Sequence, residues 1–535
     1  MILRMSVLGW LCFAVTVTAL AVTGCRTTAE QISFGPYVTH PGHTSMAVRW
    51  TSDALADGVV SFTAEGEPTR EVTAHIDMLR YPDDPDTRGM SLAGLRPDEI
   101  GTAFLYAAHL DELTPGTDYR YTIEFGGRTV EGGFRTMADQ PEPFRFIAFG
   151  DSHAQDVVAD QFAQHEPAFL INLGDTVRHE NYHEFQDYFS PTVNQMTRWF
   201  PMAAVRGNHE QRGVLFSRLF GLDPDRIYYS FEYGDALFVQ LDSSVWRWPN
   251  AEENTARMLE WAEQVLSESD ANWKIVSFHE PPYDMSYRRS RWGRYHAMEV
   301  FRRTGVDLVL NGHAHAYQRY APLYRKGENE DHPILLINSS GASEIYSTAP
   351  RRADPYLVAG AEGNHYVVID IDGDTLTGRT LRRDGDLIDE FEIRKEGGKP
   401  VAEYVEQALP EEPLDRLDRA LFRQYMDMPG GVIEEGEEFE VAIGFTAETM
   451  SIRYDFRPAA DSAHAVELVE PARGEVPAGS EKTVVVRLRA RREIRDRGGR
   501  GMTAPRVWLD CHYEVNGVEG VISSTRVWSR RPDED

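Results

Sequence analysis

Short apolar runs in this sequence lead, one after another, into Asp, Asn and His side chains. The run Phe144–Phe149 is followed by Asp151 and His153. Four later runs repeat the pattern and end at Asp175, at Asn208 and His209, at His279, and at His313 and His315. Short apolar runs bounded by turn signals are typical of strands in an α/β sheet. Because ligands bind outside the carboxyl ends of strands in such sheets, we predict a polar, metal-binding site on one edge of one sheet.

These side chains are the ligands that two divalent cations require. Hard or borderline cations bind carboxylate and amide oxygens and imidazole nitrogens. Two cations about 3.5–4 Å apart can clamp the attacking and leaving oxygens of a phosphoryl transfer. Asp151 and His153 lie two residues apart and can turn to one metal, while Asp175 follows the next strand and can bridge both. The remaining ligands would come from Asn208, His279, His313 and His315.

Length and charge limit the function classes that remain. The chain has 535 residues, which is enough for about three or four domains. Its hydrophobic content of 41% and charged content of 26% are those of a soluble globular protein. A net charge of −30 argues against a general nucleic-acid-binding surface, which needs a basic stripe. No internal stretch is long and apolar enough to span a bilayer.

The first residues have the pattern of an export signal. Arg4 provides a positive charge before the apolar run Met5–Val22. The ending Val22-Thr23-Gly24-Cys25 resembles a bacterial lipobox, which implies that a signal peptide of residues 1–24 is removed and that Cys25 carries lipid. The alternative is an ordinary signal in which the cysteine is coincidental. With Cys12 and Cys25 in this region, Cys511 has no intramolecular partner, so we expect no disulfide.

Residues 32–138 read as short strands separated by turn signals. Evenly spaced short strands are typical of a β-sandwich. The sequence Leu113-Thr114-Pro115-Gly116-Thr117, followed by Tyr119 and later by Phe134-Arg135-Thr136, resembles a fibronectin type III domain. We expect this domain to scaffold one side of the metal site, and a plain spacer is the alternative.

Residues 143–396 read as an α/β domain. Helical spacing is present in Gln155–Gln164, Glu184–Trp199, Asn254–Ser267 and Tyr295–Arg303. Asn254 is a plausible N-cap for its helix. Hairpin signals after His365 indicate a second sheet. The expected fold is therefore a sandwich of two β-sheets flanked by helices.

The last third of the chain lacks a catalytic cluster. Residues 401–429 look helical and charged, and we predict a helical linker there. Residues 430–528 alternate like the strands of an immunoglobulin-like β-sandwich. This region carries the arginines Arg487, Arg489, Arg491, Arg492, Arg495, Arg497 and Arg500. Solvation of the surface explains them better than contact with a partner or the cell envelope.

The motifs together resemble a known family. Gly-Asp-x-His, Gly-Asp, Gly-Asn-His-Glu, a His-bearing strand and Gly-His-x-His occur here in the order and spacing of the calcineurin-like metallophosphoesterases. The preceding fibronectin-like domain and the extensions after His279 and His313 make the chain similar to the purple acid phosphatase-like branch. The resemblance covers roughly residues 32–395 and leaves out the last third.

The resemblance implies a dinuclear site for two divalent or trivalent ions of Fe, Mn or Zn. One metal would be bound by Asp151, His153, Asp175 and His315. The other would be bound by Asp175, Asn208, His279 and His313. A metal-bound hydroxide would attack the phosphorus, and Asp175 and His209 would be the catalytic residues. His209, together with Asn208, would bind the substrate and would stabilise the phosphoryl oxygens or protonate the leaving group.

The sequence departs from the purple acid phosphatases in two places. Their metal-binding tyrosine corresponds to Arg178, and they lack a histidine at the position of His153. Because tyrosinate bound to ferric iron gives the purple colour, we expect a colourless or differently coloured protein in which His153 fills that position. The loop after His279 carries the arginines Arg288, Arg289 and Arg291, where many of those enzymes have paired histidines. They could hold a substrate phosphate or be solvated.

The roles of several further residues have two possible interpretations. His179 and His183 could line the cleft or be exposed at a helix start. Tyr317 and Arg319 are expected to support His315 rather than to contact substrate.

We interpret the chain as an exported, lipid-anchored metallophosphoesterase that hydrolyses phosphate monoesters. One alternative is a phosphodiesterase that acts on nucleotides or lipid head groups. A non-hydrolytic surface protein that binds a ligand is an alternative from another class. The expected partners are a small-molecule phosphoester and a membrane reached through Cys25, and the sequence does not indicate an oligomeric state.

Overall fold

The structure is a computed structural model of the chain. It describes residues 32–84, 92–189, 192–245, 250–284, 292–343, 356–412, 426–427, 432–447, 451–458, 463–495, 509–515 and 518–523. Cys25, the arginines at 288, 289 and 291, and Arg497 and Arg500 lie outside these described residues.

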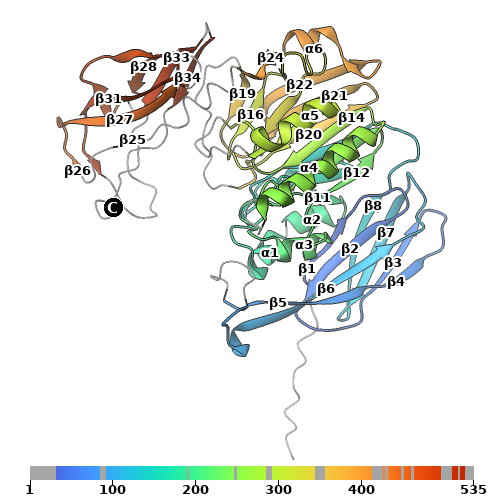
Figure 1. The fold of residues 1–535 in the computed structure, drawn as a ribbon. Helices are drawn as coiled ribbons and strands as arrows, with labels where there is room; N and C mark the ends of the chain where they lie inside the picture. The colour runs from blue at the N-terminus through green and yellow to red at the C-terminus, as the bar shows by residue number, and fades with distance from the viewer. Residues whose placement is uncertain are drawn as a thin grey trace, which may run out of the picture.

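The N-terminal part is a β-sandwich of two four-stranded antiparallel sheets (Figure 1). The first sheet has the spatial order β1 (Ile32–Thr39), β2 (Met46–Ser52), β6 (Ile100–Leu110) and β5 (His75–Pro82). The second has the order β4 (Arg70–Thr73), β3 (Val59–Ala64), β7 (Asp118–Phe125) and β8 (Arg128–Arg135). Every second side chain of β7 is buried, as expected for a strand with one face on a core. The short helix η1 (Pro97–Glu99) precedes β6.

The central part is built on two seven-stranded sheets. The first sheet has the order β11 (Met202–Ala204), β10 (Phe169–Asn172), β9 (Phe144–Phe149), β20 (His365–Asp372), β21 (Thr375–Arg382), β22 (Leu387–Glu396) and β23 (Lys399–Pro400). The second has the order β12 (Tyr229–Tyr233), β13 (Ala236–Gln240), β14 (Trp273–Phe278), β15 (Leu308–Asn311), β18 (Leu335–Asn338), β16 (Tyr317–Tyr320) and β19 (Leu357–Ala361). The predicted fold class, two sheets flanked by helices between β-rich terminal parts, is confirmed.

The ligand-bearing strands divide between the two sheets, so the prediction of a site on one edge of one sheet is wrong. β9, β10 and β11 are parallel neighbours in the first sheet. β14 and β15 are parallel neighbours in the second. The hairpins after His365 join the first sheet rather than form a second one. An apolar run identifies a strand but carries no signal for the sheet that the strand joins.

Three of the four predicted helices are shorter than expected or divided into two pieces. Residues 155–164 hold only the 3-10 turns η2 (Ala159–Gln161) and η3 (Ala163–His165). The expected helix Glu184–Trp199 is instead two, α1 (Tyr182–Tyr188) and α2 (Thr192–Thr197). Another short helix, α3 (Val214–Phe220), follows β11. Tyr295–Arg303 is divided between the π-helical turn η5 (Gly293–Ala297) and α5 (Met298–Thr304).

The longest described helix, α4, spans Ala251–Glu268 and starts earlier than predicted. Asn254 is therefore not its N-cap. Asn250 holds that position, with a left-handed backbone at φ 59° and no side-chain cap bond. The Asn254 amide already donates to the Asn250 carbonyl at 2.9 Å inside the first turn.

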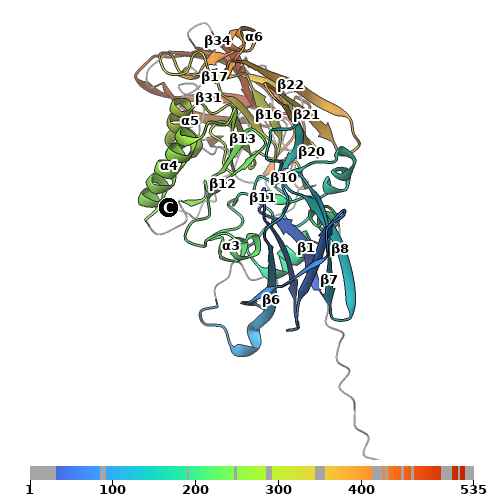
Figure 2. The same ribbon diagram turned by 90° about the vertical axis from the view of Figure 1, so that its right-hand side faces the viewer.

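Three apolar layers hold the central part together. Phe146 and Ile171 of the first sheet pack against Phe238 and Leu308 of the second, so the faces between the sheets form one core. The outer face of the second sheet packs against α4 and α5. The outer face of the first sheet packs against α1, α2 and α3. Figure 2 shows α4 and α5 beside β12 and β13 of the second sheet.

The N-terminal sandwich shares the last of these cores. Phe34 and Leu79 of the sandwich are buried in the same cluster as Ile147 of β9. The Phe34 ring stacks on Phe189 with 5.1 Å between centroids. Tyr37 is fully buried and donates its hydroxyl to the Leu219 carbonyl at 2.8 Å. This continuous packing favours a scaffold over a spacer.

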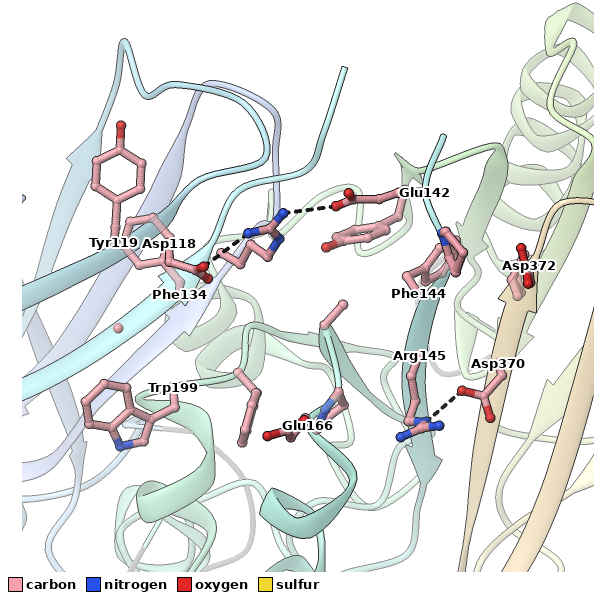
Figure 3. Close-up of a pocket in the computed structure, with 18 of the residues that line it drawn as sticks. Asp118, Tyr119, Phe134, Glu142, Phe144, Arg145, Glu166, Trp199, Asp370 and Asp372 are labelled. Carbon is pink, nitrogen blue, oxygen red and sulfur yellow. Dashed lines mark hydrogen bonds and ion pairs between the residues drawn. The ribbon is translucent and has the colours of Figure 1, made fainter. Parts of the chain in front are cut away.

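A cavity of about 790 Å³ lies between the sandwich and the start of β9 (Figure 3). Arg135 spans it by pairing with Asp118 at 3.1 Å and Glu142 at 3.2 Å. Arg145 pairs with Asp370 at 2.7 Å on the opposite wall. None of the predicted metal ligands lines this cavity, because it opens at the amino ends of the strands whose carboxyl ends carry them.

The region predicted as a linker is in part packed against the central domain. Within 401–412, α6 (Ala402–Glu406) is a short helix, the short strand β24 (Leu409–Pro410) follows it, and Glu411 and Glu412 are again helical. β24 pairs in parallel with β17 (Leu323–Tyr324). One uninterrupted helix over this segment is therefore wrong, because β24 interrupts it, and residues 413–425 lie outside the described residues.

The C-terminal part is a second β-sandwich. One sheet has the order β25 (Met426–Asp427), β27 (Glu438–Ala447), β31 (Ser480–Ala490) and β29 (Val466–Leu468). The other has the order β30 (Ala472–Val476), β28 (Ile452–Pro458), β33 (Leu509–Val515) and β34 (Val518–Ser523). A two-stranded ribbon joins β26 (Val432–Ile433) to β32 (Ile494–Arg495). Cys511 is a free cysteine buried in this core.

Three of these arginines, Arg487, Arg489 and Arg491, have acidic partners on the surface of this sandwich. Arg489 pairs with Glu438 at 2.6 Å and with Glu467 at 3.1 Å. Arg491 pairs with Glu467 at 2.8 Å. These ion pairs are exposed and account for the arginines by surface solvation.

In the part of the chain that the structure describes, no helix combines the length and the apolar character needed to cross a membrane.

Candidate metal centre

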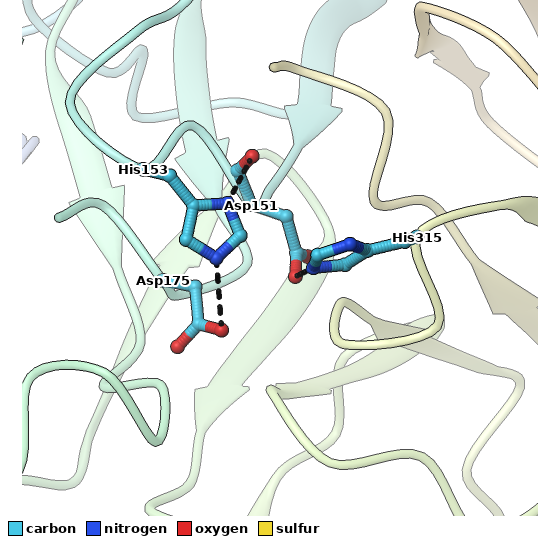
Figure 4. Close-up of side chains that lie close together, drawn as sticks. All are labelled: Asp151, His153, Asp175 and His315. Carbon is cyan, nitrogen blue, oxygen red and sulfur yellow. Dashed lines mark hydrogen bonds and ion pairs between the residues drawn. The ribbon is translucent and has the colours of Figure 1, made fainter. Parts of the chain in front are cut away.

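The loops that follow β9, β10 and β15 bring Asp151, His153, Asp175 and His315 together at one place (Figure 4). One group of potential ligands consists of Asp151, His153, Asp175 and His315, whose ligand atoms lie within 4.8 Å of one another. His315 Nε2 is 3.0 Å from Asp151 Oδ1, and His153 Nε2 is 3.6 Å from Asp175 Oδ2. All four residues are buried.

A second group consists of Asp175, His279 and His313. His279 Nε2 lies 3.1 Å from Asp175 Oδ2, and His313 Nδ1 lies 3.3 Å from His279 Nε2. Asp175 belongs to both groups, which is the position of a bridging carboxylate. Asn208 lies on the loop after β11, next to Gly207, whose backbone approaches Asp175 closely.

Five of the seven predicted ligand residues have a backbone conformation that is uncommon for side chains larger than glycine. The φ angles are 62° for Asp151, 48° for His153, 52° for Asp175, 66° for His313 and 52° for His315. A left-handed conformation at a non-glycine residue costs energy and persists only where the surroundings impose it. Hydrogen bonds between the loops impose it here, because His153 N donates to Asp175 O at 2.9 Å and His313 N donates to Asp151 Oδ2 at 2.8 Å.

Two glycines of the motifs are required by close approach. A Cβ on Gly312 would lie 2.6 Å from the Leu173 carbonyl and 2.9 Å from Asp151 Oδ2. A Cβ on Gly207 would overlap the Asp175 carboxylate. The metal-binding loops can therefore pack against one another only where these positions carry no side chain.

Glu210 holds two of the loops, a role that the sequence interpretation did not assign to it. Its buried carboxylate accepts hydrogen bonds from the amides of Gly207 at 2.7 Å, Asp175 at 3.1 Å and Val177 at 3.1 Å. Burial, followed by the nearby Asp175 charge, raises the pKa of Glu210. The only sequence signal was its place in the Gly-Asn-His-Glu motif.

The pKa values of the acidic and histidine side chains in the site depend strongly on one another. Burial alone would raise the pKa of Asp175, but His279 and His209 hold it well below its usual range. Burial alone would lower the pKa of His279, yet Asp175 and Asp151 raise it to about 10. Without metal, carboxylates and imidazoles therefore neutralise one another, so metal binding must displace protons.

Three buried oxygens test whether a metal fits the site. Asn208 Oδ1 is buried without a hydrogen-bond partner, while Asp151 Oδ1 and Asp175 Oδ2 are buried beside His315 Nε2 at 3.0 Å and His279 Nε2 at 3.1 Å without a well-aligned hydrogen bond. A buried polar atom that is left unsatisfied costs about 1–3 kcal/mol, so three poorly satisfied oxygens in one place need an explanation. The ring orientation agrees, because His279 Nδ1 is bound to the Leu173 carbonyl at 2.8 Å and its Nε2 faces Asp175. The residues present fit metal cations.

His209 stands beside these groups. Its amide donates to Asp175 Oδ1 at 2.9 Å, and its Nδ1 lies 2.6 Å from the Arg178 carbonyl. Its Nε2 is 3.8 Å from Asp175 Oδ2, and its ring centroid lies 4.9 Å from that of His153. The side chain is about one-third exposed, so solvent and a ligand can reach it.

Other predicted residues contact protein groups. His179 pairs with Glu184 at 2.7 Å, and His183 Nε2 lies 3.2 Å from the Asp83 carbonyl. Tyr317 donates to Asp389 at 2.7 Å, and Arg319 binds the same carboxylate through two nitrogens at 2.6 and 2.8 Å. Tyr317 and Arg319 thus brace the strand that begins directly after the His315 loop.

Comparison with known proteins agrees with this geometry. The family model "Calcineurin-like phosphoesterase" matches residues 144–317, from the start of β9 to just beyond His315. The chain contains a calcineurin-like phosphoesterase domain. Purple acid phosphatase 15 of Arabidopsis thaliana is similar, with 26% identity over 206 residues, which are 35% of this chain and 38% of that protein. Acid phosphatase type 7 of Mus musculus is 22% identical over 402 residues, and this match covers 65% of this chain and 87% of that protein.

Among solved structures, a purple acid phosphatase from yellow lupin seeds is similar in fold. It has a TM-score of 0.53 and 18% identity, and the match covers 69% of this chain and 75% of that chain. The phosphoesterase domain therefore has the purple acid phosphatase-like fold and a buried Asp and His cluster able to bind metal. The matches to the first four plant relatives span between 38% and 62% of those proteins.

Proposed function

We propose that the chain is a dinuclear metal-dependent hydrolase of phosphate esters. The observation that carries this proposal is the pair of ligand groups that share Asp175. One cation would be held by Asp151, His153, Asp175 and His315. The other would be held by Asp175, Asn208, His279 and His313. Two bound cations would supply a water of lowered pKa and would neutralise charge on a phosphoryl group.

The chain's own residues would orient the reaction. The Arg178 carbonyl fixes the ring of His209 through Nδ1, which leaves Nε2 directed to the reacting group. A protonated His209 can donate Nε2–H to a phosphoryl oxygen or to the leaving oxygen. Asn208 would bind the substrate beside it. The arginines at 288 and 289 are further candidates that the described residues do not include.

The metals proposed are Fe, Mn or Zn, without the tyrosinate of purple acid phosphatases. His153 supplies an imidazole to the first group, and Arg178 contributes its backbone carbonyl to His209. Loaded protein should then lack the visible absorption band of a ferric tyrosinate. Metal analysis with an absorption spectrum tests this point, and a purple protein would contradict it.

We propose phosphate monoesters as the substrates, because exported enzymes of this kind often serve to scavenge phosphate. Diesters of nucleotides or lipid head groups are the second candidate. The assay is turnover of p-nitrophenyl phosphate against bis(p-nitrophenyl) phosphate, with each metal supplied. A strong preference for the bis ester would replace the monoester proposal.

A change at Asp175 tests hydrolysis itself. Asp175→Asn removes the shared charge at the same size, so turnover should fall by a factor of about 100 or more while the fold persists. Circular dichroism and urea unfolding check the fold. If the wild type with Mn, Fe or Zn hydrolyses no phosphoester in a broad panel, a non-hydrolytic binding protein is the better account.

We further propose export and lipid attachment at Cys25, on the basis of the signal pattern at residues 1–25. Cys25→Ser should release the protein from the membrane fraction of a bacterial host that performs this modification. Retention of the variant in that fraction would exclude the anchor.

A further inference from the structure

The segment that leads to the C-terminal sandwich is fixed to the loop that follows His279. β24 pairs with β17, and the Leu409 amide donates to the Pro322 carbonyl at 2.8 Å. Tyr356 donates its hydroxyl to the Pro410 carbonyl at 2.8 Å. These bonds place Glu411, the next residue, inside the protein, where it is 1% exposed.

The buried Glu411 carboxylate joins two parts of the phosphoesterase domain. Its Oε1 accepts a hydrogen bond from the Tyr283 hydroxyl at 2.6 Å. Its Oε2 accepts one from Arg302 of α5 at 2.8 Å. Arg325 lies 3.5 Å from the same carboxylate. A buried carboxylate with this many charged and polar donors is strongly held, and removal of one partner leaves the others unsatisfied.

Tyr283 is in turn part of a buried network. Its carbonyl accepts a hydrogen bond from Asn338 Nδ2 at 2.9 Å, and Asn338 pairs in register with Asn311 at the end of β15. Asn311 Nδ2 donates to the Phe278 carbonyl at 2.7 Å, directly before His279. The Arg294 guanidinium lies 4.2 Å above the Tyr283 ring.

The link from Tyr283 to the metal ligands is short and stiff. Pro281 and Pro282 separate Tyr283 from Glu280, and proline fixes its own φ angle. The Gly312 amide donates to the His279 carbonyl at 3.1 Å, so the same network reaches the loop of His313. A displacement of Tyr283 would therefore be passed to His279 and His313, the two imidazoles of the second ligand group.

We propose that Glu411 is a positioning residue for the second cation site, and this rests on the proposed function. Glu411 fixes Tyr283, and Tyr283 fixes the main chain that carries His279 and His313. Glu411 lies beyond residues 144–317, so the segment outside the family match completes the metal centre. The first group is linked to this network through the His313 amide, which donates to Asp151 Oδ2 at 2.8 Å, whereas His279 is carried by the main chain that Tyr283 fixes directly.

The test compares metal binding by full-length variants. Tyr283→Phe removes the hydroxyl that donates a hydrogen bond to the Glu411 carboxylate, and it keeps the aromatic ring under Arg294. Glu411→Gln keeps the size of the side chain and removes its charge. Glu412→Gln is the matched control, because Glu412 is the next residue and accepts only an exposed bond from the Lys326 amide at 3.2 Å among the contacts described.

Metal-free protein is titrated with Mn²⁺ or Zn²⁺ in a calorimeter, and kcat and KM are measured on p-nitrophenyl phosphate. Loss of a group that orients a ligand typically weakens metal binding about 10- to 100-fold. We expect Tyr283→Phe and Glu411→Gln to weaken one of two sites by about tenfold or more. The other site and the control variant should keep wild-type affinity. In a His313→Ala background, which lacks a ligand of the second group, Tyr283→Phe should have no further effect.

Two results would overturn the proposal. One is wild-type affinity at both sites in both variants. The other is equal weakening at both sites together with a lower free energy of unfolding, which would mean that Glu411 stabilises the whole domain. A wild-type protein that binds two cations and hydrolyses phosphoesters while the variants behave normally would defeat this inference alone. Absence of metal binding in the wild type would instead defeat the proposed function.

Discussion

At the scale of single residues, the site separates ligands from a residue that acts beside them. His209 contacts the Arg178 carbonyl through Nδ1, and its Nε2 lies 3.8 Å from Asp175 Oδ2. It is not a member of either ligand group among the described residues. Its role can therefore be separated from metal binding by experiment.

His209→Gln should lower kcat while the metal content stays at the wild-type level. General acid catalysis contributes about 10²–10⁴ in rate, and it matters most for a poor leaving group. The loss should thus be larger for an alkyl phosphate than for p-nitrophenyl phosphate. Steady-state kinetics on both substrates, with metal analysis of the same samples, measures it. An equal loss on both substrates would exclude proton donation to the leaving group.

His153→Ala should remove one of the two cations. His153 belongs only to the first ligand group, and its imidazole faces Asp175 at 3.6 Å. The second group of Asp175, Asn208, His279 and His313 remains complete. Metal analysis should fall from two ions to one for each chain. Retention of both ions would show that His153 is not a ligand.

The sequence predicted the Asp and His residues that cluster in the structure, because each of them is marked twice. Asp151 follows an apolar strand and lies within a motif, and the same holds for Asp175 and His279. Glu411 and Tyr283 carry no such mark. Their contact joins positions 128 residues apart, and only the folded chain brings them to 2.6 Å.

At the scale of elements, the loops of the site depend on Glu210 more than on helices. Its carboxylate receives three backbone amides from the loops after β10 and β11. The helices near the site are short, and α1 and α3 have only seven residues each. Loop-to-loop hydrogen bonds therefore determine the ligand positions.

Glu210→Gln should destabilise these loops. The amide has one oxygen for the three donors, and its NH₂ group must face at least one of them. An unsatisfied buried donor costs about 1–3 kcal/mol, and we expect a loss of this size in the free energy of unfolding. Urea unfolding of metal-free protein measures the loss, and metal titration should show weaker binding. The exposed Glu166→Gln is the control, and an unchanged Glu210→Gln would contradict this role.

Strands were easier to predict than helices for a physical reason. β9, β10, β14 and β15 are buried on both faces, so their sequences are continuous apolar runs. The expected helix Glu184–Trp199 is divided because Pro191 lies within it, and α2 begins only at Thr192. Residues 155–164 have helical spacing but too little local hydrogen bonding for more than two 3-10 turns. The spacing of apolar residues alone did not distinguish a continuous helix from a divided helix or from short 3-10 turns.

At the scale of the molecule, the N-terminal sandwich and the phosphoesterase domain share a core. Phe34→Ala removes a ring that stacks on Phe189 and should cost about 3–5 kcal/mol. Because the core is continuous, activity should be lost on heating at the same temperature at which the sandwich unfolds. Phe62→Ala, in the core of the sandwich alone, is the matched comparison. Separate transitions for the two parts in the Phe34 variant would indicate a spacer.

The interface between these two parts should also make stability depend on pH. His40 is part-buried, and its Nε2 lies 2.8 Å from the Phe220 carbonyl. Burial, and then the Arg49 charge, lowers the pKa of His40 to about 4. The unfolded chain takes up this proton near pH 6.5 and the folded chain does not, so the free energy of unfolding falls as pH falls from about 6.5 to about 4. The slope from this residue is at most about 1.4 kcal/mol per pH unit.

His40→Gln keeps a donor for the Phe220 carbonyl and removes the titration. Its free energy of unfolding should fall less between pH 7 and pH 5 than that of the wild type, when both are measured by urea unfolding. Part of the fall should persist, because burial also lowers the pKa of His365 to about 4. Equal falls in the two proteins would mean that His40 is protonated in the folded chain. The interface would then accept a charge next to Arg49, which its burial argues against.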